Sequence, residues 1–301
     1  MTTTSLAAAE IDALMLKHPK GFDLSLDRIR RLLTELGEPQ RKLPPQIHIA
    51  GTNGKGSVTA FCRAILEADG QAVHAHTSPH LVNWHERYRI GRKGEPGALV
   101  DDAMLAEAVA RAAKANAGAP ITVFEILTAV TFLLFSENPA DAVLLEVGLG
   151  GRFDATNVIE KPAVTVITAI SLDHQSYLGD RVELIAAEKG GIIKRGVPVV
   201  LGQQNESIAL EVLTSMADRA GAPLLVYGQD FFAYEEHGRL VYQDESGLLD
   251  LPMPRLPGRH QLTNAATAIA ALRHGGFAPA DKAIEAGLSH VEWPGRMQQI
   301  A

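Results

Sequence analysis

The stretch HIAGTNGKGSV, residues 48–58, places a glycine-rich loop between a buried apolar run and a helical pattern. That context is typical of a phosphate-binding loop, which joins a strand to the N-terminus of a helix. The stretch departs from the usual consensus sequence, G-x-x-x-x-G-K-[ST]. Ile49 stands where the first glycine belongs, and Gly56 rather than Ser or Thr follows Lys55 directly. The loop is therefore either a nucleotide-binding loop with a different consensus sequence or a tight turn with an incidental lysine.

The side chains of the loop favour the nucleotide. Gly51, Gly54 and Gly56 let backbone N–H groups approach phosphate oxygens closely, and the helix N-terminus adds positive potential. Lys55 can supply a cation to the β- and γ-phosphates, and the Ser57 hydroxyl can bind Mg²⁺. The stretch predicts a site for a nucleotide with magnesium.

Short β-branched runs alternate with longer helical patterns on both sides of this loop. Continuous apolar runs are typical of strands that are covered on both faces of a sheet. The expected strands are 46–51, 71–77, 141–148, 163–170, 198–202 and 223–228, and the expected helices are 58–70, 101–118, 124–138, 182–194 and 206–220. This β-α-β succession predicts an α/β fold with a doubly wound, mainly parallel sheet.

The last quarter of the chain has a different texture. Residues 230–255 contain short alternating segments between turn residues and predict a small antiparallel β segment, and two closing helices are expected at 261–276 and 279–290. Residues 294–301 turn extended after the last helix, which is typical of a linker. We therefore expect one domain over residues 1–293.

Composition narrows the class of protein. A chain of 301 residues with 46% hydrophobic and 21% charged residues is ordinary for a globular protein, and its net charge of -7 gives no electrostatic reason to expect nucleic acid or anionic lipid. Cys62 is the only cysteine, so no intrachain disulfide can form, and we interpret it as a buried apolar residue rather than a nucleophile. Glu10 and Asp12 interrupt the N-terminal apolar stretch, which argues against a signal peptide. Without an apolar run of about 20 residues either, the sequence predicts a cytoplasmic protein that does not enter membranes.

Polar residues follow several expected strands. Glu146 ends one strand and is either a Mg²⁺ ligand at the edge of the sheet or a solvated edge residue; the phosphate loop favours the metal. Asp173 and His174 end another, and His174 could bind a metal or be structural. Lys189 beside Glu188 reads, from its spacing alone, as a solvated lysine.

Three further stretches stay open. His74 and His76 share a strand face, but no cysteine or carboxylate completes a familiar metal-ligand set around them and His80. Ser78-Pro79 marks a strand-to-loop turn, and Phe124-Glu125 opens a helix, where it can pack and cap. Arg152, Asp154 and Asn157 are expected to be polar tips of a loop.

Seven stretches together resemble the folylpolyglutamate synthase/dihydrofolate synthase family of the Mur ligase superfamily. They occur in the family's order from about residue 20 onward: HIAGTNGKGSV, TSPHL, TVFEILTAVTFLLF, LLEVGLGGRFDATN, SLDHQSYLG with AAEKGGIIK, GRHQLTNAATAIAAL and WPGRM. GFDLSLDRI, residues 21–29, resembles the N-terminal segment of the bifunctional bacterial members, which handle dihydropteroate as well as folates. The resemblance implies that GTNGKGS is this family's version of the phosphate loop.

The resemblance also implies roles for individual residues. It implies catalytic roles for Lys55, Lys189 and His174, with Lys189 carbamylated to a metal-binding carboxylate. Two Mg²⁺ ions are implied, one on Ser57 and Glu146 and one on His174. The implied ATP contacts are Thr52, Asn53, Gly54, Lys55, Gly56, Ser57, Asn264 and Arg296, and the implied pterin contacts are Ser78, Pro79, His80, Phe124 and Asp154.

The implied reaction is ATP-dependent. ATP phosphorylates a carboxylate of dihydropteroate or a tetrahydrofolate, and the amine of L-glutamate attacks the acyl phosphate in a monomeric enzyme. The resemblance implies a smaller C-terminal domain after Ala301, so we expect this chain to be the ATP-binding domain of a longer ligase, with full activity requiring the remainder. Two alternatives remain: a ligase for UDP-muramoyl peptides, for which the chain offers no extra N-terminal substrate domain, and a non-catalytic Mg-ATP-binding module.

Overall fold

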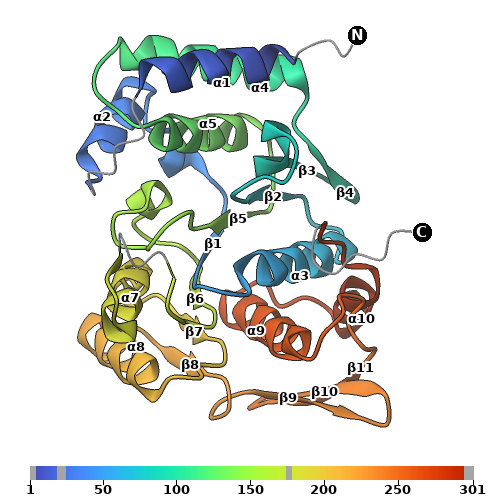
Figure 1. Cartoon of the computed structure of the whole chain (residues 1–301). Coiled ribbons are helices and arrows are strands. Elements are labelled where there is room, and N and C mark those ends of the chain that lie inside the picture. Colours follow the sequence, from blue (N-terminus) through green and yellow to red (C-terminus); the bar gives the residue numbers. More distant parts are fainter. Residues whose placement is uncertain (1–4, 19–24, 174–177, 295–301) are drawn as a thin grey trace.

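An eight-stranded sheet runs through the middle of the computed structural model, which describes residues 5–18, 25–173 and 178–294 (Figure 1). The strand order is β4-β3-β2-β5-β1-β6-β7-β8. The strands are β1 Gln46–Ala50, β2 Val73–His76, β3 Tyr88–Arg92, β4 Glu95–Leu99, β5 Ala142–Glu146, β6 Val164–Ile167, β7 Val199–Leu201 and β8 Leu224–Val226. All neighbours from β2 to β8 pair in parallel, while β3 and β4 pair antiparallel. The prediction of a mainly parallel α/β sheet is confirmed.

Helices cover both faces of the sheet, as a doubly wound fold requires. Ile47 and Ile49 of β1 face a core shared with α3 (Lys55–Ala68), α9 (His260–His274) and α10 (Asp281–His290). On the other face lie α1 (Leu6–Lys17), α2 (Asp27–Glu35), α4 (Asp102–Asn116) and α5 (Val123–Glu137), and α7 (Val182–Lys189) and α8 (Ser207–Ala220) continue it beside β6 and β7. In the described residues, no helix has the length and apolar character needed to cross a bilayer. Cys62 lies buried in the core, as expected.

The small antiparallel segment is also confirmed. Strands β9 (Phe232–Glu236), β10 (Arg239–Asp244) and β11 (Gly247–Leu251) form a separate three-stranded sheet, which lies at the lower edge of Figure 1. Arg273 of α9 pairs with Asp244 at 2.8 Å, and the Tyr242 hydroxyl donates to the same carboxylate. Because Tyr242 is buried in the same core as α9, this sheet is fixed against the main one.

Some elements differ from the sequence expectations. The helix expected at 58–70 begins at Lys55, and the one expected at 182–194 ends at Lys189, where Gly190 and Gly191 lead into a short 3-10 turn. Helices α1 and α2 and the hairpin of β3 and β4 were not expected. The β4 sequence EPGAL contains proline and glycine, which an edge strand tolerates but which hide it from a pattern search.

His48, His74 and His76 are buried, and each makes a hydrogen bond to another part of the protein. His74 Nε2 lies 3.0 Å from the Asn138 carbonyl oxygen, its Nδ1 accepts from the Gly91 N–H, and its ring stacks on Phe135. His76 Nδ1 lies 2.9 Å from Thr131 Oγ1. Burial lowers the pKa of His48 and of His76 to about 3. These rings therefore stay neutral in the folded protein.

Acidification is expected to destabilise the fold through these rings. A histidine whose folded pKa lies below its unfolded value of about 6.5 contributes nothing above pH 6.5 and loses stability as the pH falls towards 3. At pH 5.5, His48 and His76 should each lower the free energy of unfolding by about 1.4 kcal/mol relative to pH 7.5. Denaturant titrations at both pH values measure this, with His76→Phe as the control whose pH-dependent drop should be smaller by about 1.4 kcal/mol. An equal drop in the variant would exclude His76 as a source.

Candidate active site

The glycine-rich loop lies at the C-terminal end of β1, where the strand order changes direction between β5 and β6. Gly51 has a φ of 143°, and a Cβ atom there would lie 1.9 Å from Thr168 Oγ1. Gly54 has a φ of 96°, and its Cβ would lie 2.6 Å from Asn264 Oδ1. The N–H groups of Thr52 and Asn53 both donate to the Ala169 carbonyl, which anchors the loop on the end of β6. Both glycines are therefore required by the backbone path itself.

Helix α3 begins at Lys55, so the loop leads its first-turn N–H groups towards the ligand side, as phosphate binding needs. Lys55 Nζ bends back over the loop and donates to the Gly51 and Thr52 carbonyls at 3.0 and 3.3 Å. The Ser57 hydroxyl is buried and accepts from Gln261 Nε2 at 3.3 Å. The helix N-terminus, the Lys55 ammonium and the Ser57 hydroxyl therefore all lie at the first turn of α3.

A cavity of about 590 Å³ opens over this loop. Its other walls are the ends of β5, β6 and β7 and the start of α9. Asn264 lies in the wall and donates to Gln261 Oε1 at 3.0 Å. The lining residues are Thr52, Asn53, Gly54, Lys55, Gly56, Ser57, Glu146, Thr168, Ala169, Gly202, Gln203, Asn205, Arg259, His260, Gln261, Thr263, Asn264 and Thr267.

Glu146 and Lys189 are two buried charged residues close to the loop: Glu146 lines the cavity, and Lys189 binds the carbonyl of Gly51. Glu146, the last residue of β5, is 5% exposed, lines the cavity and accepts from the Ser78 N–H at 3.4 Å. Lys189 is 3% exposed and donates to the Gly51 carbonyl at 2.9 Å. Burial, followed by the repulsion of Lys55, lowers the pKa of Lys189 to about 8. The interpretation of Lys189 as a solvated lysine is therefore wrong.

A second cavity, of about 580 Å³, adjoins the first and shares Glu146 with it. Ser78 and Pro79, joined by a cis peptide bond, lie in its wall together with Trp293. Trp293 also packs on the first turn of α3, since a Cβ on Gly56 would lie 2.6 Å from its ring. His80 is not in this wall: its Nδ1 accepts from Arg87 Nε, and its ring packs against Trp84.

Phe124 and Asp154 meet at the turn that follows Glu146. A Cβ on Gly148 would lie 2.4 Å from Phe124 Cζ and 3.3 Å from Asp154 Oδ2, so ring and carboxylate flank the same glycine. Asp154 and Asn157 are 4% and 6% exposed, so the expectation that they are polar tips is wrong, while Arg152 is exposed. Burial raises the pKa of the Asp154 carboxyl, against four hydrogen bonds that lower it.

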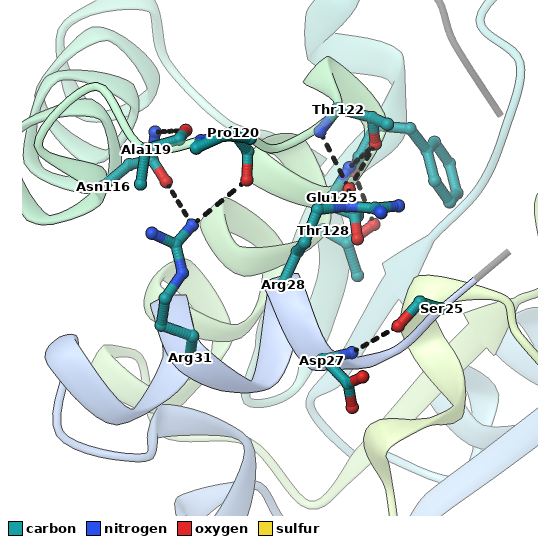
Figure 2. A network of polar contacts seen from close by, with 11 residues as sticks. Ser25, Asp27, Arg28, Arg31, Asn116, Ala119, Pro120, Thr122, Glu125 and Thr128 are labelled. Atoms are coloured by element: carbon teal, nitrogen blue, oxygen red, sulfur yellow. Dashed lines mark hydrogen bonds and ion pairs between the residues drawn. The ribbon is translucent and has the colours of Figure 1, made fainter. Parts of the chain in front are cut away.

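Glu125 caps helix α5, as its position after Phe124 suggested. Its carboxylate accepts from the Thr122 N–H and hydroxyl and pairs with Arg28 Nε at 3.1 Å, as Figure 2 shows. In the same view Arg31 reaches Asn116 Oδ1. The Arg28 contact attaches α2 to the N-terminal end of α5, the helix that carries Phe124, and the Arg31 contact attaches it to the C-terminal end of α4.

Some expected site residues cannot be placed. His174 and Arg296 lie outside the described residues. Among the residues that the structure does describe, no group of three His, Cys, Asp or Glu side chains could hold a metal ion. Magnesium in nucleotide sites is commonly bound by one or two protein oxygens together with phosphate oxygens, a set that Ser57 and Glu146 fit.

Sequence reasoning missed several residues of the nucleotide cavity. Gln203 and Asn205 follow β7, Thr168 follows β6, and Arg259, His260 and Gln261 begin α9. Their position after strand ends of a parallel sheet is the signal that could have found the first three. A phosphate loop at the switch point of such a sheet, with a carboxylate and a lysine beside it, defines a nucleotide-dependent phosphoryl-transfer enzyme.

Comparisons with known proteins identify the family. A model of the Mur ligase middle domain matches residues 49–272. A dihydrofolate synthase/folylpolyglutamate synthase of Bacillus subtilis is 37% identical over 294 residues, which cover 93% of this chain and 67% of the relative. The chain therefore belongs to the Mur ligase family, among its dihydrofolate and folylpolyglutamate synthases. It spans about two thirds of the length of the relatives that it matches.

Solved structures agree with this placement. The fold is similar to Escherichia coli FolC in complex with DHPP and ADP, with a TM-score of 0.89, 34% identity and coverage of 99% of this chain and 69% of that one. A bifunctional folylpolyglutamate synthase/dihydrofolate synthase with Mn, AMPPNP and L-glutamate bound gives a TM-score of 0.86 at 34% identity, covering 99% and 69%. The family resemblance expected from the sequence is confirmed.

Proposed function

We propose that this chain carries the ATP site and the pterin site of a ligase that joins a pteroate or folate carboxylate to L-glutamate. The observation that carries the proposal is a cavity lined by the phosphate loop and Glu146, which adjoins a second cavity, while the buried Lys189 binds the carbonyl of Gly51 at the start of the same loop. The names of the relatives add the folate substrate class. They favour it over a UDP-muramoyl peptide.

The phosphate loop holds ATP in this proposal. Backbone N–H groups of Gly54 and Gly56 and the Lys55 ammonium contact the phosphates, and Thr52, Asn53, Asn264 and Arg296 complete the nucleotide site. Ser57 and Glu146 hold Mg²⁺, which offsets the negative charge that develops on the transferring phosphoryl group. His174 is the proposed ligand of a second ion.

Lys189 is the proposed site of a carbamate. Its neutral amine attacks CO₂, a C–N bond forms and one proton is released, so a cation becomes a carboxylate. The lowered pKa supports this, because near pH 8 about half of the amine is neutral. A carboxylate there would also remove the repulsion between Lys189 and Lys55.

The substrate carboxylate attacks the γ-phosphorus of ATP, ADP leaves, and an acyl phosphate forms. The amine of L-glutamate then attacks the acyl carbon; phosphate leaves, and an amide remains. The pterin is proposed to lie in the second cavity against Ser78 and Pro79, with Phe124 and Asp154 at the turn after Glu146 as further contacts; His80, which lies outside the cavity wall, is left out of the proposed contacts. We further propose that the protein acts as a cytoplasmic monomer.

Phosphate release tests the proposal. With Mg-ATP present, dihydropteroate and L-glutamate together should release phosphate, and omission of either should abolish the release. A matched reaction with Glu146→Gln should be strongly reduced, since a neutral amide binds magnesium more weakly than a carboxylate does. If ATP binds but no release follows in any combination, the chain is a non-catalytic Mg-ATP-binding module.

A further inference from the structure

A buried histidine lies in the middle of the strand that leads into the phosphate loop. His48 of β1 is 0% exposed, with Ile47 and Ile49 as its neighbours along the strand. A strand covered on both faces normally carries apolar side chains, because a buried polar ring loses its hydration. The imidazole therefore has to be explained by what it contacts.

The number of protons on His48 and Thr156 determines which of the two donates the hydrogen bond between them. Burial lowers the pKa of His48 to about 3, so the ring is neutral and has a single N–H. His48 Nε2 lies 2.9 Å from Thr156 Oγ1, and Thr156 gives its own hydroxyl proton to Asp154 Oδ1 at 2.5 Å. The threonine oxygen can then only accept from the ring. His48 Nε2 is the donor, and Nδ1, which has no hydrogen-bond partner in the described part of the chain, carries the lone pair.

At the end of this series of hydrogen bonds, the Asp154 carboxylate binds the backbone of the loop that follows Glu146. Asp154 Oδ1 also accepts from the Thr156 N–H, while Oδ2 accepts from the N–H groups of Gly148 and Leu149 at 3.0 and 2.9 Å. Gly148 is the residue against which the Phe124 ring packs. It follows Glu146, the proposed magnesium ligand, by two residues. The orientation of the Asp154 carboxylate therefore sets the path of the backbone between the metal site and the pterin site.

We propose that His48 and Thr156 are positioning residues that hold the Asp154 carboxylate and, through it, the 148–154 loop in the conformation that binds the pterin. The inference rests on the proposed function for the identity of the ligand. Neither residue touches the ligand. Their effect is transmitted by oriented donors to a buried carboxylate, where charge-assisted hydrogen bonds are strongest.

Paired substitutions test this. Thr156→Val removes the hydroxyl at nearly constant volume, and Thr156→Ser restores it. His48→Phe removes the N–H, and His48→Gln restores a donor near the Nε2 position. In calorimetric titrations with Mg-ATP present, Thr156→Val should weaken dihydropteroate binding about tenfold and His48→Phe about threefold. The conservative variants should recover most of the loss, and the affinity for Mg-ATP alone should stay within about twofold of the parent.

Hydrogen exchange supplies a readout that needs no pterin. In Thr156→Val the N–H groups of Gly148 and Leu149 should exchange about tenfold faster, while those of the buried strand β5 keep the parent rate. Equal effects of Thr156→Val and Thr156→Ser, or unchanged affinity with unchanged exchange, would overturn the proposal. Failure of the parent chain to bind dihydropteroate would refute the proposed ligand instead, and the exchange rates would still decide whether the two residues position the loop.

Discussion

Lys55→Ala is expected to weaken Mg-ATP binding by about a hundredfold or more. The ammonium lies on the phosphate loop, hydrogen-bonded to the Gly51 and Thr52 carbonyls, within the cavity that would enclose the phosphates. Removing the positive partner of a largely buried charge pair costs about 2–5 kcal/mol. Isothermal titration of the chain with Mg-ATP measures the effect directly.

Two features make this result interpretable. Lys282→Ala is the matched control, because Lys282 is an exposed lysine on α10, and its removal should leave the affinity unchanged. Lys55 also repels Lys189, so its removal should not destabilise the fold electrostatically. Unchanged Mg-ATP affinity in Lys55→Ala would remove the glycine-rich loop from the nucleotide site.

The second large effect is expected at Lys189. Lys189→Ala should reduce substrate-dependent phosphate release by about 10²–10³-fold, because in the proposed mechanism it removes a preorganised charge near the transferring phosphoryl group. Added short carboxylates such as formate should restore part of the rate by entering the space left by the side chain. Full activity of Lys189→Ala without any additive would mean that no carbamate is needed.

A spectroscopic measurement checks the same residue without turnover. In ¹³C-bicarbonate, the chain should show a carbamate carbon resonance that is strong at pH 8.5 and weak at pH 6.5, because only the neutral amine reacts and its pKa is about 8. The resonance should vanish in Lys189→Ala and persist in Lys194→Ala, a control at a partly buried lysine whose pKa burial also lowers. A resonance that survives the loss of Lys189 would place the carbamate elsewhere.

Periodicity predicted the fold wherever the sheet is buried on both faces. The apolar runs at β5 and β6 and the glycine-rich turn after β1 carry strong local signals, and these elements lie within a few residues of where they were expected. The β3–β4 hairpin was missed because edge strands need no apolar run and tolerate Pro96. Helix α1 was missed since its register is set by packing on α4, which lies some ninety residues away in the sequence.

The residues of the candidate site likewise divide into those with a local sequence signal and those placed only by the tertiary fold. The loop residues and Glu146 were predictable because chemistry and strand position coincide in the sequence. The spacing around Lys189 gave no such signal, and only the family resemblance pointed to it, because only the tertiary fold places its ammonium 2.9 Å from the Gly51 carbonyl and buries it. Asp154 was mistaken for a loop tip, since the donors that surround it come from backbone N–H groups, which carry no signature in the sequence.

Calorimetric titration of this chain with dihydropteroate, in the presence of Mg-ATP and beside a parallel titration with a UDP-muramoyl peptide, tests the central claim most directly. The account predicts saturable binding of dihydropteroate that is weakened by Lys55→Ala and no binding of the muramoyl peptide. Binding of the muramoyl peptide, or of neither compound while Mg-ATP itself binds, would contradict the assignment of a pterin site to this chain.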